Sequence, residues 1–188
     1  MVDWEEILHI LVSVITIALA FSLFKSEVFD PYYFFLVLVT VGSAFILHEM
    51  AHKYVAIHYG AHATYRAWTI GLFLALVMAF ITKGGFVFAA PGAVYIFGNV
   101  TRKQNGIISL AGPLTNLALA ALFFIVLLFA PGLQELAMTG VAVNLFLGAF
   151  NMIPIYPMDG SKVLAWNQTV WLGVFGVFAV LLLGFGIF

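Results

Sequence analysis

Five long apolar stretches constrain the fold of this 188-residue chain more than any other feature of its sequence. Each is long enough to cross a bilayer as a helix, which takes roughly 17–25 residues. Only 8% of the residues are charged, which is too few to cover the surface of a soluble domain. The sequence therefore predicts an all-α polytopic membrane protein. The stretches are Ile7–Phe24, Pro31–Tyr59, Ile107–Ala130, Leu136–Ile153 and Thr169–Phe188.

Composition excludes several classes of function. The chain has no cysteine, so disulfides and thiolate metal sites are excluded. Its seven basic and eight acidic residues nearly cancel, which gives no electrostatic basis for binding nucleic acid. We expect no nucleic-acid partner, and we expect the lipid bilayer of the cell membrane to surround a multi-pass protein.

Two further segments decide the topology. Thr69–Thr82 is apolar but shorter than a full span, and Gly85–Asn99 has the composition of a hairpin or bent strand. If Thr69–Thr82 dips into the membrane without crossing it, only Lys25 lies opposite the other basic residues, as the positive-inside rule favours. We therefore favour five crossings over six. The six basic residues on one face are then Lys53, Arg66, Lys83, Arg102, Lys103 and Lys162.

The second apolar stretch contains the motif H-E-x-x-H, from His48 to His52. Residues four apart on a helix lie about 40° apart in angle and about 6 Å apart along the axis, so both imidazoles can reach one zinc ion. Glu49 lies between them in angle and can act as a general base. Ionisable residues are costly at membrane depth. The alternative is a pair of buried histidines bonded to carbonyl groups, which leaves Glu49 unexplained.

A catalytic zinc ion needs a third protein ligand. His58 has the spacing of an extended zinc motif, but Val55 stands where that motif has the glycine that turns the chain. The helix should therefore continue, and we interpret His58 as an interfacial residue, like His9 and His62.

Asp159 is the better candidate for the third ligand. It follows Pro154 and Pro157, which break the preceding helix, and it comes before Gly160, which permits a sharp turn. An irregular backbone at membrane depth is tolerated where it is buried in protein or lines a water-filled cavity. The alternative is an aspartate that caps a helix at the membrane surface.

Three motifs in this order resemble the site-2 protease family of intramembrane zinc metalloproteases. They are H-E-x-x-H, the Gly112-Pro113-x-x-Asn116 sequence, and the N-x-x-P-x-x-x-x-D-G sequence from Asn151 to Gly160. The resemblance implies that His48, His52 and Asp159 bind one Zn²⁺ per chain and that Glu49 is the general base. The sequence has no internal repeat or linker, so we expect a single transmembrane metalloprotease domain over residues 1–188. We also expect a minimal form of the family, without a PDZ domain or a nucleotide-binding extension.

The resemblance gives further residues a role. It implies that Asn151 holds the substrate carbonyl or the developing oxyanion, as an amide donor can; a hydrogen bond that fixes the broken helix is the alternative. For Asn116 we favour a structural role, because buried amides hold membrane helices together. The family hairpin corresponds to Gly85–Phe97, near the active site, where an edge strand can pair with an unwound substrate.

The sequence therefore predicts an intramembrane zinc endopeptidase that cleaves transmembrane segments of other membrane proteins. A second hypothesis is a non-catalytic membrane protein that binds or moves a divalent metal through the same three ligands. A third is a purely structural helical bundle, which predicts that the purified protein contains no zinc.

Overall fold

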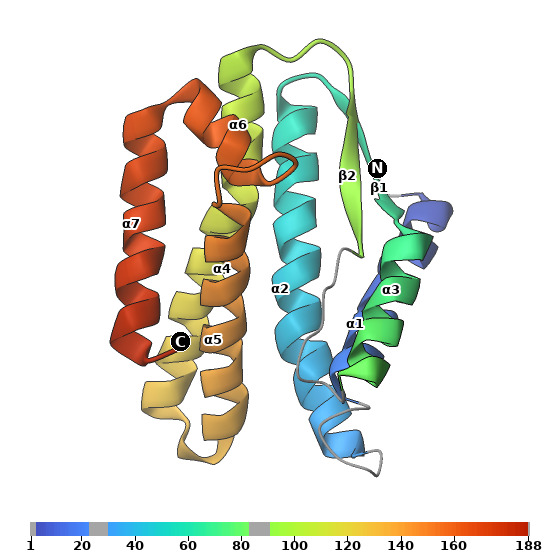
Figure 1. Ribbon diagram of the computed structural model, residues 1–188, viewed down its shortest axis with the longest axis vertical. Coiled ribbons are helices and arrows are strands. Elements are labelled where there is room, and N and C mark those ends of the chain that lie inside the picture. Colours follow the sequence, from blue (N-terminus) through green and yellow to red (C-terminus); the bar gives the residue numbers. More distant parts are fainter. Residues whose placement is uncertain (1–2, 23–29, 83–90, 188) are drawn as a thin grey trace. The chain divides into compact units, whose positions relative to one another are not determined.

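The structure is a computed structural model that describes residues 3–22, 30–82 and 91–187 (Figure 1). Within these residues it contains seven α-helices, one short 3₁₀ helix and a two-stranded sheet, so the predicted all-α membrane architecture with a small β element is confirmed. The elements are α1 (Trp4–Ser22), α2 (Pro31–His58), β1 (His62–Ala67), α3 (Thr69–Ile81), β2 (Gly92–Phe97), α4 (Arg102–Phe129), η1 (Pro131–Leu133), α5 (Gln134–Asn151), α6 (Asp159–Trp166) and α7 (Gln168–Phe185).

Five helical segments of the described chain are long and apolar enough to cross a membrane. They are α1, α2, α4, the combined segment Pro131–Asn151 that contains α5, and α7. The helix α3 is apolar but shorter. That α3 dips into the membrane without crossing it stays a prediction.

Local sequence explains where α2 begins and ends. The Asp30 carboxylate accepts hydrogen bonds from the backbone N–H groups of Tyr32 at 2.9 Å and Tyr33 at 3.3 Å, and Pro31 occupies the first turn, where its missing N–H costs nothing. The helix continues past Val55 and stops before Gly60, whose φ is 81°. This left-handed residue closes the helix in the way that glycine favours.

The chain divides into two compact units, and each is described by itself. The first comprises Met1–Ile46 and Thr64–Tyr95. In it, α1 packs against α3, and polar side chains of α1 bind β1. The buried Glu6 carboxylate accepts from the Tyr65 backbone N–H at 2.8 Å, and the His9 Nδ1 accepts from the Ala67 N–H at 3.2 Å. The Glu5 carboxylate lies 2.7 Å from the Arg66 guanidinium, and this hydrogen bond raises the pKa of Arg66.

The two strands run antiparallel. The Trp68 N–H, just after β1, donates to the Pro91 carbonyl oxygen at 2.9 Å, and the His62 and Phe97 rings lie 6.0 Å apart at the other end. Residues 85–90 of the predicted hairpin lie outside the described residues. The remainder forms β2, and its partner β1 precedes α3 in the chain, which the sequence analysis did not predict.

The second unit comprises Leu47–Ala63 and Ile96–Phe188. Its helix α4 packs along α5 and against α6, while α7 packs against α5 and α6. The buried side chains at its centre come from α4, α5, α6, α7 and the segment after α5. These are Ala120, Val141, Leu145, Met152, Val163, Phe178 and Leu182. The candidate site is built entirely from residues of this unit. That residues 1–188 form a single domain stays a prediction.

Candidate metal centre

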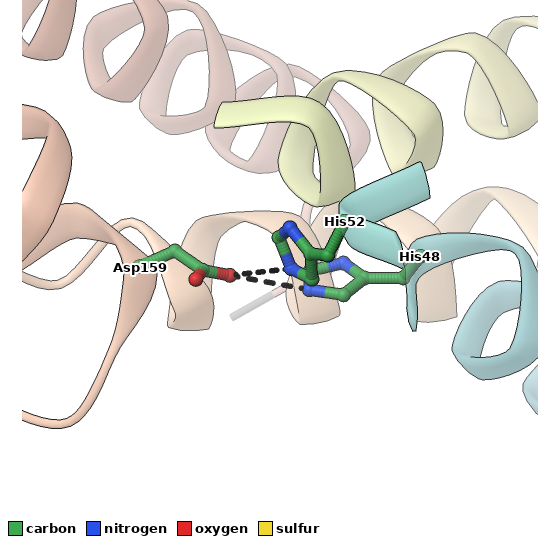
Figure 2. Close-up of side chains that lie close together, drawn as sticks. All are labelled: His48, His52 and Asp159. Atoms are coloured by element: carbon green, nitrogen blue, oxygen red, sulfur yellow. Dashed lines mark hydrogen bonds and ion pairs between the residues drawn. The ribbon is translucent and has the colours of Figure 1, made fainter. Parts of the chain in front are cut away.

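Three buried side chains of the second unit converge on one point (Figure 2). His48 and His52 come from α2 with only 3% and 7% of their surface exposed, and Asp159 is the first residue of α6, with 8% exposed. The Asp159 Oδ2 lies 3.3 Å from the His48 Nε2 and 3.1 Å from the His52 Nε2. One ligand atom from each residue lies within 4.8 Å of the other two.

This arrangement fits a zinc ion. Zinc prefers nitrogen and oxygen ligands of this kind at bond lengths of about 2.0–2.2 Å, and a tetrahedron of that size has edges of about 3.3 Å. The two nitrogen–oxygen distances at Asp159 are close to this value. The donor set and its spacing are therefore suited to one divalent metal ion with a further coordination position open to substrate or water.

Hydrogen bonds orient both imidazoles. The His52 Nδ1 lies 2.7 Å from the Ile108 carbonyl oxygen, which can only accept, so Nδ1 donates there. The His48 Nδ1 lies 2.5 Å from the Asn116 Oδ1 and donates to it. In both rings Nδ1 is therefore the donor to this partner, and Nε2 faces Asp159. Partners of this kind commonly fix the orientation of histidine ligands in metal sites.

The second carboxylate oxygen of Asp159 faces a different group. The Lys162 Nζ lies 3.5 Å from the Asp159 Oδ1, one turn along α6. The carboxylate thus presents Oδ2 to the histidines and Oδ1 to a cation. This division favours coordination of a metal ion through Oδ2 alone.

Gly112 allows α4 to approach the histidines closely. A Cβ atom at this position would lie 2.5 Å from the His48 Nε2 and 2.5 Å from the His52 Nε2. Real Cβ atoms essentially never approach other atoms so closely. The glycine of the Gly-Pro motif is therefore needed for the imidazoles to occupy their positions.

The backbone around Met152 positions Asp159. The Met152 carbonyl oxygen, one residue beyond the end of α5, accepts a hydrogen bond from the Trp171 indole N–H at 2.8 Å. A Cβ atom at Gly160 would collide with the same carbonyl oxygen. Gly160 lies within α6 and not at a sharp turn, so what it provides is close packing against Met152.

The comparisons with known proteins agree with this site. The model of "Peptidase family M50" matches residues 34–143, more than half of the chain, including His48, Glu49 and His52. The chain belongs to peptidase family M50. The resemblance to site-2 proteases is thereby confirmed.

Curated relatives of this M50 chain are named as zinc metalloproteases. It is 47% identical over 171 residues to MJ0611 of Methanocaldococcus jannaschii, covering 89% of this chain and 87% of the relative. It is 31% identical over 150 residues to YwhC of Bacillus subtilis, covering 67% and 66%. It is 28% identical over 157 residues to zinc metalloprotease MJ0392 of M. jannaschii, covering 80% of this chain but 38% of that protein. No solved structure matches the chain. The chain is a multi-pass membrane metalloprotease with zinc as its cofactor.

The other predicted site residues of this M50 chain lie as follows. Glu49 is half-buried on α2, next to His48. Asn116 accepts a hydrogen bond from His48, so it contacts a predicted zinc ligand in addition to the structural role expected for it. The Asn151 amide donates to the Leu147 carbonyl oxygen of its own helix at 3.0 Å. His58 is the exposed last residue of α2, with its ring against Tyr59.

Sequence reasoning missed three residues near the site. Lys162 could have been found, because it stands three positions after Asp159 in a chain with few basic residues. Asn144 could have been noticed as a polar residue within the apolar α5. For Trp171 the sequence offers no comparable signal, because its partner is a backbone carbonyl group.

Proposed function

We propose that this chain is an intramembrane zinc endopeptidase that hydrolyses peptide bonds within or near transmembrane segments of membrane proteins. The observation that supports this most strongly is the cluster of His48, His52 and Asp159, buried among helices of membrane-spanning length. Membership of the M50 family supports the protease chemistry. We further propose that the protein resides in the cell membrane and works as one domain with one zinc ion per chain.

In this proposal His48, His52 and Asp159 hold the zinc ion. When bound there, zinc polarises the substrate carbonyl group and lowers the pKa of water. The chain itself holds the three ligand atoms in position before the ion binds. The Ile108 carbonyl and the Asn116 amide hold the two rings, and Lys162 holds the far oxygen of Asp159.

Glu49 acts as the general base. Its carboxylate takes a proton from the attacking water as the water oxygen bonds to the scissile carbonyl carbon. It then gives the proton to the amide nitrogen as the carbon–nitrogen bond breaks, which leaves an amine and a carboxyl group. The position of Glu49 on α2 beside His48, half-buried, suits a group that must reach water.

Asn151 has two candidate roles. As an amide donor it could bind the oxyanion that develops on the substrate. Its hydrogen bond to Leu147 instead supports a role in fixing the last turn of α5. An Asn151→Leu substitution that lowers kcat without changing thermal stability supports the first role, and the reverse result supports the second.

Substrates must unwind locally, because the peptide bonds of a helix are shielded by their own hydrogen bonds. We therefore expect faster cleavage of transmembrane segments that contain glycine or proline near the cut than of uniform polyleucine segments.

The test is cleavage in liposomes. Purified wild-type protein is reconstituted with a membrane-protein substrate that has a Gly-Pro pair in its transmembrane segment, and the products are mapped by mass spectrometry. We expect a zinc-dependent cut inside or next to that segment, and none with Glu49→Gln. Cleavage that survives Glu49→Gln, or cuts confined to soluble loops, would contradict the proposal. Zinc binding without any cleavage by the wild type would favour the metal-binding alternative.

A further inference from the structure

A line of three hydrogen bonds leads from the His48 ring across α4 to α5. The His48 Nδ1 donates to the Asn116 Oδ1 at 2.5 Å. The Asn116 Nδ2 donates to the Asn144 Oδ1 at 3.0 Å, and the Asn144 Nδ2 donates to the Gly140 carbonyl oxygen at 2.8 Å. Both asparagine side chains are fully buried, with 0% exposed surface. Buried amides at membrane depth are costly unless they are paired.

The backbone carbonyl at the far end fixes the direction of every bond in this line. The Gly140 oxygen can only accept, so Asn144 must turn its Nδ2 toward it. Asn144 then presents Oδ1 to Asn116, which must donate from its own Nδ2. That leaves the Asn116 Oδ1 facing His48, whose Nδ1 must donate. Reversal of either amide would bring two acceptors together in a buried place.

The two imidazoles are therefore held by equivalent means. His52 donates directly to the backbone carbonyl of Ile108. His48 reaches the Gly140 carbonyl through two side-chain amides. In both rings Nδ1 donates to a fixed acceptor, so the neutral form of each imidazole has its lone pair on Nε2, the nitrogen that faces Asp159.

We propose that Asn144 is a positioning residue for the metal centre: acting through Asn116, it keeps the His48 Nε2 available to zinc. The inference rests on the proposed function, in which His48 is a zinc ligand. Without Asn144, nothing in this line opposes reversal of the Asn116 amide. A reversed Asn116 presents Nδ2 to His48, favours the ring form with a proton on Nε2, and so competes with metal binding.

A double-mutant cycle on zinc affinity tests this. The zinc Kd is measured by competition with a chromophoric chelator for the full-length protein in detergent, as wild type, Asn116→Leu, Asn144→Leu and the double variant. Loss of such a partner typically weakens metal binding about 10–100-fold. We expect this loss for Asn116→Leu and about a 3–30-fold loss for Asn144→Leu. Because Asn144 acts through Asn116, the double variant should lie within about twofold of Asn116→Leu.

Two results would overturn the inference. One is a zinc Kd for Asn144→Leu within twofold of wild type; the other is losses that multiply in the double variant, as independent structural effects would. Val141→Ala is the matched control, because Val141 is equally buried on α5 and belongs to the apolar core. Its zinc Kd should stay within twofold of wild type. If Asn144→Leu does not fold, the cycle is repeated with Asn144→Ala, which removes the amide without adding bulk.

The same measurements separate this inference from the proposed function. Wild-type protein that binds no zinc, or His48→Ala that binds it as tightly as wild type, contradicts the assignment of His48 as a ligand. Wild-type binding that depends on His48 but not on Asn144 contradicts only the inference.

Discussion

The indole N–H of Trp171 donates to the carbonyl oxygen of Met152 at 2.8 Å and so joins α7 to the residue that follows α5. Gly160, the residue after Asp159, packs against the same carbonyl oxygen. The helix α7 therefore helps to position the carboxylate of the metal centre, although none of its side chains belongs to the group of His48, His52 and Asp159.

Replacement of Trp171 with phenylalanine should lower both the thermal stability of the protein and its affinity for zinc. The ring can keep its stacking on Phe175, at 5.3 Å, but the Met152 carbonyl loses its donor. Loss of one partner of a buried hydrogen bond costs about 1–3 kcal/mol. We expect a lower Tm and weaker zinc binding, measured by thermal unfolding and chelator competition. Trp68→Phe, at an exposed position, is the control, and equal behaviour of the two variants would contradict this account.

Gly112→Ala should abolish tight zinc binding. The added methyl group would lie 2.5 Å from both Nε2 atoms, so at least one imidazole must move. Gly173→Ala makes the same chemical change in a helix with open space around it and should leave the zinc Kd within about twofold of wild type. Chelator competition compares them. A Gly112→Ala protein with wild-type affinity would show that the histidines are not held as described.

Lys162→Met should weaken zinc binding by about threefold to thirtyfold, because Asp159 loses the cation that holds its Oδ1. Lys162→Arg keeps the charge and should recover part of the affinity. Lys103→Met removes an exposed charge from the first turn of α4 and serves as the control. The interpretation fails if the Lys162 and Lys103 variants bind zinc equally well.

Tyr65→Phe tests the packing of the first unit. The Tyr65 hydroxyl is fully buried and donates to the Ser13 Oγ at 2.8 Å. Its removal should lower the free energy of unfolding by about 1 kcal/mol. Tyr95→Phe, at an exposed position on β2, should change it much less. Denaturant unfolding followed by circular dichroism measures both, and a larger effect at Tyr95 would be inconsistent with the structure.

The sequence predicted those features that depend on residues close together in the chain. Hydropathy predicted the long helices, and the helical repeat explains why His48 and His52 share one face. The continuation of α2 to His58 followed from the absence of a glycine at position 55. Asp159 was selected from the prolines before it and the glycine after it, and the family resemblance added its role as a ligand. Its convergence with the histidines agrees with that expectation.

Features that depend on tertiary packing were not predictable in the same way. The strand β1 has only six residues, and its alternation of buried Ala63 and Tyr65 is too short to be distinguished from a loop. The hydrogen bonds of Asn116 and Asn144 depend on how α4 and α5 approach each other. The need for glycine at position 112 follows from two rings contributed by another helix.

His48, His52 and Asp159 should bind the zinc ion, whereas Glu49 should not. Elemental analysis of protein dialysed against zinc-free buffer measures the zinc content of each variant. We expect about one zinc per chain in wild type and in Glu49→Gln, and a clear loss in His48→Ala, His52→Ala and Asp159→Ala. Full zinc content in Asp159→Ala, or loss of zinc in Glu49→Gln, would contradict the assignment.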